Sequence, residues 1–148
     1  MRKLKIFITG GGIAGAFSAY LLGRDGHDVH VIERRKPAPS GQVANATGRT
    51  GNFTLSDRGR KSLESAGLLE KAMSFALPLD GRMVHLPYAP FTMFSPYGGF
   101  QEDILHSISR SDLQSLLLGE AMKVAKFHFG DTLVDVDPFK KSAVFTSD

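Results

Sequence analysis

The first 33 residues of this chain constrain its fold more than any other part of the sequence. A strand is predicted over 3–9, where apolar and polar residues alternate, and it runs directly into a glycine-rich turn. Apolar residues at helical spacing then predict a helix over 13–25, and a second apolar run predicts a strand over 29–32. Strand, helix and strand in this order favour a parallel sheet with a right-handed crossover, as in α/β proteins.

The turn has the spacing Gly10-x-Gly12-x-x-Gly15, which is typical of dinucleotide binding. Gly10 allows the tight turn off the strand, Gly12 lets the backbone approach a pyrophosphate, and Gly15 lets the helix pack on the sheet. The start of the helix offers free N–H groups and a positive dipole end to the phosphates. Glu33 ends the second strand, where a carboxylate accepts hydrogen bonds from ribose hydroxyls. The pattern predicts an adenine-dinucleotide site; the alternative is a glycine-rich turn in an unrelated α/β unit.

Composition narrows the remaining classes of function. The chain has 148 residues, enough for a domain with its own core, and its sequence has no apolar run as long as a membrane span. It has no cysteine, which excludes disulfides, thiolate metal sites and a cysteine nucleophile and favours a cytoplasmic location. The net charge of +3 and one basic cluster, 34–36, do not predict a nucleic-acid surface. The five histidines show no ligand spacing, so no metal site is expected.

Later parts of the chain are predicted to alternate between short helices and strands. Ser56 is the expected N-cap of a helix that ends at Gly67, and a shorter helical stretch follows over 68–75. Ser111 and Gln114 resemble a capping box that starts a further helix. The expected strands are 82–85, 92–94, 126–129, 133–136 and 143–146.

A second informative segment, 48–68, follows the predicted β-α-β unit. Its distinctive residues are Gly48-Arg49, Asn52, Leu55-Ser56, Arg58-Gly59 and Ala66-Gly67-Leu68. Further residues continue in order along the chain: Pro78, Arg82-Met83, His85, Pro96-Tyr97-Gly98, Ser109-Arg110, Leu113 and Leu117. In this combination the chain resembles the kynurenine 3-monooxygenase family.

The resemblance implies a fold and an activity. It implies an α/β, Rossmann-like FAD-binding fold: a parallel sheet with a β-α-β start and a helical insertion. Members of this family bind FAD, take electrons from NADPH and use O2 to hydroxylate the aromatic ring of L-kynurenine. They are considerably longer, so residues 1–148 are expected to be an incomplete, N-terminal part of the FAD-binding domain, with 78–108 contributing to a substrate-binding region. The chain alone is then expected to be inactive, and to self-associate through an uncovered apolar face.

The resemblance also assigns roles to individual residues. Arg34 is expected to reach the adenosine end beside Glu33, Arg49 and Asn52 to pass near the flavin, and Arg110 to approach the FAD. The full set of expected cofactor-binding residues is Gly10, Gly12, Ile13, Ala14, Gly15, Glu33, Arg34, Arg49, Asn52 and Arg110.

Arg82 and Tyr97 match the pair that holds the substrate's carboxylate, and a guanidinium and a phenol can both donate to one carboxylate. Because the flavin carries the chemistry, no dedicated catalytic side chain is expected. Two alternatives stay open. The apolar segment 86–95 is compatible with a related flavin hydroxylase for another aromatic substrate, and the chain's length is compatible with a non-catalytic dinucleotide-binding module.

Overall fold

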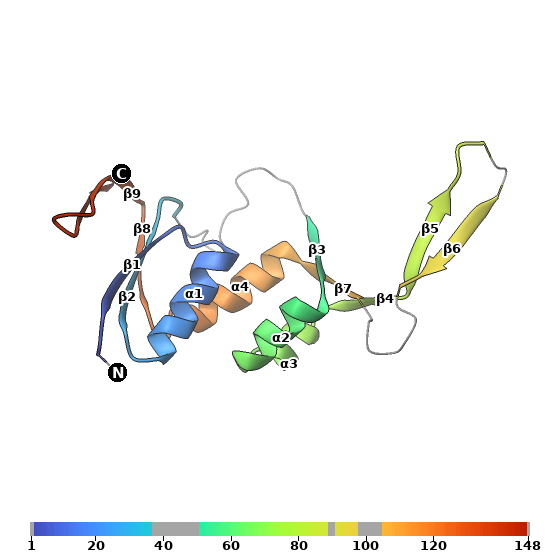
Figure 1. The fold of residues 1–148 in the computed structure, drawn as a ribbon, viewed down its shortest axis with the longest axis horizontal. Coiled ribbons are helices and arrows are strands. Elements are labelled where there is room, and N and C mark those ends of the chain that lie inside the picture. Colours follow the sequence, from blue (N-terminus) through green and yellow to red (C-terminus); the bar gives the residue numbers. More distant parts are fainter. Residues whose placement is uncertain (1, 37–50, 89–90, 98–104, 148) are drawn as a thin grey trace. The chain divides into compact units, whose positions relative to one another are not determined.

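The computed structural model of the protein describes residues 2–36, 51–88, 91–97 and 105–147. The chain forms two compact units (Figure 1). Unit 1 combines residues 1–49 with 111–148, and unit 2 comprises residues 50–110. The region 78–108, predicted to contribute to substrate binding, therefore falls inside unit 2.

Unit 1 is built on a parallel sheet with strand order β1-β2-β8, which confirms the predicted α/β class. Its strands are β1 (Lys5–Thr9), β2 (Asp28–Glu33) and β8 (Lys126–Phe129). Helix α1 (Ile13–Arg24) connects β1 to β2, and α4 (Arg110–Ala121) precedes β8. In the register, Ile8 lies opposite Val31, and Val31 lies opposite Phe127.

Small residues allow α1 to lie close to the rest of unit 1. Ala16 and Ala19 are fully buried on this helix, as is Val31 on the central strand. A Cβ at Gly23 would lie 2.6 Å from the Val124 carbonyl oxygen, so this close approach requires glycine. The β-α-β unit is thus fixed by local sequence and by tight backbone packing.

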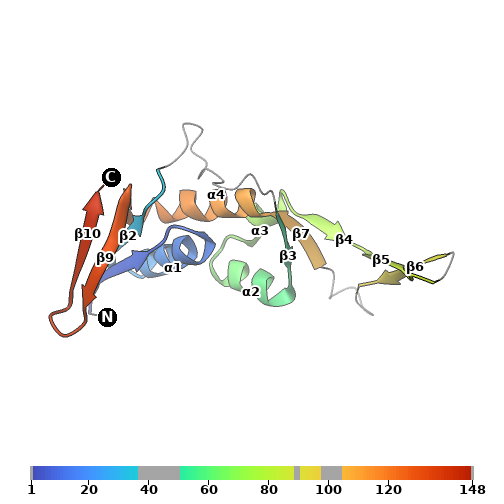
Figure 2. The same cartoon turned by 90° about the horizontal axis from the view of Figure 1, so that it is seen from above.

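A hairpin of β9 (Asp131–Asp137) and β10 (Ser142–Ser147) completes unit 1. Figure 2 shows the two strands side by side, next to β2. The Phe145 ring of β10 lies 6.0 Å from the Phe7 ring of β1, so the hairpin contacts the sheet. Ile8, by contrast, lies 3.5 Å from the position of a Cβ on Gly15 of α1. Since successive side chains of a strand face opposite ways, α1 and the hairpin lie on opposite faces of the sheet.

Unit 2 contains an antiparallel sheet with strand order β3-β7-β4. These strands are β3 (Asn52–Leu55), β7 (Leu105–Ser109) and β4 (Leu77–Leu79). Two helices, α2 (Asp57–Ser65) and α3 (Leu69–Met73), lie between β3 and β4 in the sequence. A separate hairpin pairs β5 (Gly81–His85) with β6 (Thr92–Pro96).

One of the two predicted helix starts needs correction. The capping box at Ser111 and Gln114 was a wrong prediction, because α4 begins at Arg110 and Ser111 already lies in its first turn. Ser56 does occupy the N-cap of α2, although its side chain makes no capping hydrogen bond.

None of the described helices is long and apolar enough to cross a membrane.

Candidate dinucleotide site

The glycine turn between β1 and α1 has the geometry that its spacing predicts. Gly10 has a φ of +92°, a left-handed conformation that strongly favours glycine, and its N–H donates to the Ile32 carbonyl at 2.7 Å. A Cβ at Gly15 would lie 1.9 Å from the Gly10 carbonyl oxygen, so a side chain is excluded there. A Cβ at Gly12 would meet nothing within 4 Å. The turn is therefore closed toward the helix and open at Gly12, where a pyrophosphate needs room.

The first turn of α1 is not neutralised by the described side chains. Gly12 is the N-cap and makes no side-chain hydrogen bond, and the first helical turn contains no acidic residue. Ile13 is half-buried and Ala14 is exposed. The positive end of the helix thus retains the N–H groups that bind an anion.

Glu33 connects the end of β2 to this turn. The residue is only 5% exposed. Its Oε2 accepts the Gly11 N–H at 2.7 Å, and its Oε1 accepts the backbone N–H and the Nε–H of Arg35 at 2.9 and 3.0 Å. Burial raises the pKa of Glu33, but hydrogen bonds from Arg35 and Gly11 and the Arg35 charge outweigh this effect and hold the pKa below its ordinary value. Glu33 is consequently a buried carboxylate that stays ionised at neutral pH.

The existing hydrogen bonds of Glu33 limit how many it can accept from a ribose. A carboxylate has about four acceptor positions, and the turn and Arg35 occupy three of them. One position on Oε2 is left for a ribose hydroxyl, and a second hydroxyl would have to replace a contact of Arg35. Glu33 therefore holds the turn in place in addition to any role in binding.

In the basic cluster 34–36, it is Arg35 that contacts Glu33. Arg34 is exposed, and its expected role at the adenosine end stays a prediction. The sequence signals a basic cluster after the strand but does not distinguish which member reaches the carboxylate.

Two of the residues predicted to lie near the flavin meet in unit 2. Asn52 of β3 pairs with Ser109 of β7. The next residue, Arg110, donates its N–H to the Gly51 carbonyl at 3.0 Å and holds its guanidinium 5.7 Å from the centre of the Phe53 ring. Asn52 and Arg110 thus lie together at one end of the β3–β7 pair. Arg49 lies outside the described residues.

The predicted substrate pair, Arg82 and Tyr97, lies on the β5–β6 hairpin of unit 2. Arg82 is opposite Ser95, and Tyr97 follows two residues later with its N–H donating to the Asp80 carbonyl at 3.0 Å. Because paired side chains of neighbouring strands lie on the same face, this register puts Arg82 and Ser95 on one face of the hairpin, and Tyr97 directly follows the end of β6.

Comparison with known proteins identifies the family. The profile of the family described as FAD dependent oxidoreductase matches residues 5–103. The chain belongs to this family. The glycine turn, the uncapped start of α1 and the buried Glu33 fit the adenosine and pyrophosphate half of FAD, the cofactor of these oxidoreductases.

Curated relatives and solved structures refine the comparison. The kynurenine 3-monooxygenase of Salinispora arenicola is 37% identical over 138 residues, and that of Dictyostelium discoideum is 36% identical over 145 residues. These alignments cover 92% and 97% of this chain and confirm the resemblance; the chain spans about 30% of the length of these relatives.

Solved structures agree on the fold. P. aeruginosa PqsL in complex with 2-aminobenzoylacetate has a TM-score of 0.69 at 22% identity, covering 95% of this chain and 37% of that one. The tetrameric form of 2-methyl-3-hydroxypyridine-5-carboxylic acid oxygenase has a TM-score of 0.74 at 17% identity, covering 97% and 38%. The Rossmann-like FAD-binding fold is thereby confirmed.

Proposed function

We propose that this chain carries the adenosine-binding half of an FAD site in a monooxygenase that hydroxylates L-kynurenine with NADPH and O2. The observation that supports this most is the connection between the glycine turn and β2. Glu33 is buried, ionised and bonded to the Gly11 N–H, so a hydrogen bond joins the proposed ribose acceptor to the proposed pyrophosphate turn. The identity to kynurenine 3-monooxygenases supports the choice of reaction.

The roles of the residues follow from this proposal. Gly10, Gly12 and Gly15 shape the turn, and the N–H groups at the start of α1 bind the pyrophosphate. Glu33 accepts from the adenosine ribose, with Arg34 at the same end, and Arg49, Asn52 and Arg110 approach the flavin side. When bound, FAD supplies the redox chemistry of the reaction. The protein binds and orients it.

We infer the substrate role of unit 2 from the β5–β6 hairpin. Arg82 on β5 and Tyr97 directly after β6 supply a guanidinium and a phenol, which can both donate to the carboxylate of an amino acid. In a longer protein that contains this chain, Arg82→Ala is expected to raise the apparent Kd for kynurenine and to leave the FAD content unchanged. Arg82→Lys, the matched control, restores the charge but not the two-pronged geometry, so its recovery is partial.

The same hairpin favours a second candidate, a related flavin hydroxylase for a different aromatic substrate. Phe91, Met93 and Phe94 are more than half exposed, and such a surface suits a more apolar ligand. Wild-type kynurenine affinity in Arg82→Ala, combined with unchanged FAD binding, would favour this candidate over the first.

The experiment that tests the proposal is the absorbance spectrum of the purified chain, before and after addition of FAD. Flavin bands that remain after gel filtration are expected. A colourless protein that does not bind added FAD would instead indicate a non-catalytic module.

With FAD, NADPH and kynurenine together we expect no 3-hydroxykynurenine from these 148 residues alone, because walls that exclude water must surround the flavin ring. Self-association remains a prediction, which sedimentation would check.

A further inference from the structure

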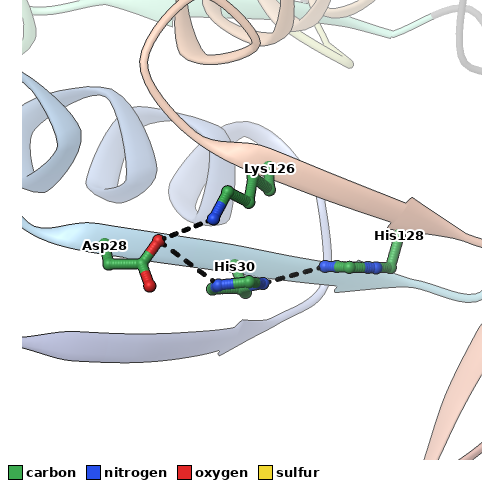
Figure 3. A network of polar contacts seen from close by, with 4 residues as sticks. All are labelled: Asp28, His30, Lys126 and His128. Carbon is green, nitrogen blue, oxygen red and sulfur yellow. Dashed lines mark hydrogen bonds and ion pairs between the residues drawn. The ribbon is translucent and has the colours of Figure 1, made fainter.

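The face of the parallel sheet that contacts the β9–β10 hairpin carries a cluster of aromatic and charged side chains (Figure 3). The Phe7 ring lies 5.2 Å from the His30 ring, and the His30 ring lies 5.3 Å from the His128 ring at an interplanar angle of 10°. These three rings come from β1, β2 and β8 and run across all three strands of the sheet. The cluster lies on the face opposite α1 and takes no part in the proposed dinucleotide site.

Polar contacts join the two imidazoles to each other and to their neighbours. The Nδ1 of His30 lies 3.0 Å from the Nε2 of His128, at hydrogen-bond distance. The Nε2 of His30 lies 3.4 Å from the Asp28 carboxylate, at ion-pair distance but without a hydrogen bond, and the carboxylate accepts a hydrogen bond from the Lys126 ammonium at 3.0 Å. Figure 3 shows these contacts as one chain, from Lys126 through Asp28 and His30 to His128. The His30 side chain is only 13% exposed, so water screens its contacts weakly.

The hydrogen bond between the imidazoles limits how many protons the pair can hold. A neutral imidazole has one N–H and one acceptor nitrogen, whereas an imidazolium has two N–H groups and no acceptor. With no added proton, His128 donates to His30, and His30 directs its other N–H at Asp28. With one added proton, His30 donates to His128, and its positive charge faces the Asp28 carboxylate. With two added protons, two N–H groups and two positive charges face each other, and the contact is lost.

The surrounding charges oppose a second proton. On β1 the Lys5 ammonium lies 5.4 Å from the Phe7 ring, and on β8 Lys126 adds another positive charge. The hydrogen bond from Lys126 holds the pKa of Asp28 below its ordinary value, so this carboxylate stays ionised where histidines titrate. From the hairpin, Phe145 of β10 is apolar, and Asp131 of β9 accepts a hydrogen bond from Ser147. Asp28 is already paired with Lys126, so it does not compensate two imidazolium charges.

We infer that the hydrogen bond between His30 and His128 forms a tie between β2 and β8. This tie persists when the pair takes up one proton and breaks when it takes up a second. The tie sits beside the end of β2, where Ile32 pairs with His128 and accepts the Gly10 N–H. Loss of this tie weakens the pairing of β2, the strand that ends at Glu33, with β8. Because the contact between the imidazoles is lost when both are protonated, we expect the pairing of β2 with β8 to weaken as the pH falls.

An NMR titration of the 148-residue chain from pH 8 to pH 5 tests this inference without any cofactor. The ring carbons of His30 and His128 report protonation, and amide exchange, corrected for its intrinsic pH dependence, reports β2–β8 pairing. Only one of the two rings is expected to take up a proton while the amides of Glu33 and Phe129 stay protected. Uptake of the second is expected to lower that protection about tenfold or more.

Two variants sharpen the test. His128→Phe keeps a stacked ring but removes one titrating group, so protection at Glu33 should no longer depend on pH in this range. His85→Phe removes an exposed imidazole on β5 and should keep the wild-type pH profile. Protonation of both rings with the strand pairing intact would overturn the inference. Should His128→Phe not fold, the wild-type titration alone still decides.

Discussion

The β-α-β unit and the β5–β6 hairpin carry their candidate site residues in very different ways. Glu33 is 5% exposed, accepts three hydrogen bonds and is held by a turn in which glycine is sterically required. Arg82 and Tyr97 lie on a two-stranded hairpin whose large apolar side chains, Met83 among them, are exposed. A two-stranded hairpin is marginally stable by itself. The comparison teaches that Glu33 is fixed by several contacts within its own unit, while Arg82 and Tyr97 are candidate residues on a hairpin with exposed apolar side chains.

The largest expected effect comes from a variant that disrupts the glycine turn of the β-α-β unit. Gly15→Ala places a methyl group 1.9 Å from the Gly10 carbonyl oxygen, so helix and turn must move apart. We expect a loss of about 1–3 kcal/mol or more in the free energy of unfolding. Gly12→Ala is the matched control, since its Cβ meets nothing within 4 Å and its backbone is extended. Denaturant unfolding followed by circular dichroism measures both. Equal stability of the two variants would contradict the account of the turn.

A smaller effect concerns acid stability. The pKa of Glu33 is lowered in the folded chain, so its stabilisation is complete above its unfolded pKa of about 4.3 and is lost as the pH falls through the lower folded value. Arg35→Ala removes the largest of the contacts that lower this pKa. We expect the variant to be less stable by about 1 kcal/mol at pH 6, with the difference shrinking below pH 4. Unfolding at several pH values measures this, and Arg34→Ala, which alters the exposed neighbour, serves as the control. A difference that does not change with pH would refute the role of Arg35.

The smallest effect is predicted on the hairpin side. Arg82→Ala should change the free energy of unfolding by no more than about 0.5 kcal/mol, because Arg82 is exposed on a strand that little else supports. Thermal unfolding of the variant beside the wild-type chain checks this. A loss as large as that of Gly15→Ala would show that Arg82 has a structural role, and would remove the contrast between the two regions.

The sequence predicts the local parts of the fold better than the long-range ones. The β-α-β unit emerges because its turn, helix and strands each have their own signal within 33 residues. Strands β3, β4 and β7 are absent from the predicted elements. They have three to five residues, and β3 and β7 pair across about 50 intervening positions, so hydrophobic periodicity gives little indication of them.

The candidate site shows the same limit. Gly10, Gly12, Gly15 and Glu33 can be located from spacing alone, because Gly10 and Gly15 meet backbone requirements of the turn, Gly12 completes the motif and Glu33 ends its strand. The contact between Arg35 and Glu33 depends on how the chain leaves β2, and the pair of His30 with His128 depends on which strand follows β2 in the sheet. No local sequence pattern predicts either of these two contacts.

The central claim is that the glycine turn and the end of β2 form the adenosine half of an FAD site, and calorimetric titration of FAD into the 148-residue chain tests it most directly. Wild-type chain and Arg82→Ala, the control outside this site, should bind FAD with the same affinity. Glu33→Ala should bind about ten- to hundredfold more weakly, since a charge-assisted hydrogen bond contributes about 1.5–3 kcal/mol. Circular dichroism of Glu33→Ala separates lost binding from lost folding. Wild-type affinity in folded Glu33→Ala, or no FAD binding by the wild-type chain, would contradict the account.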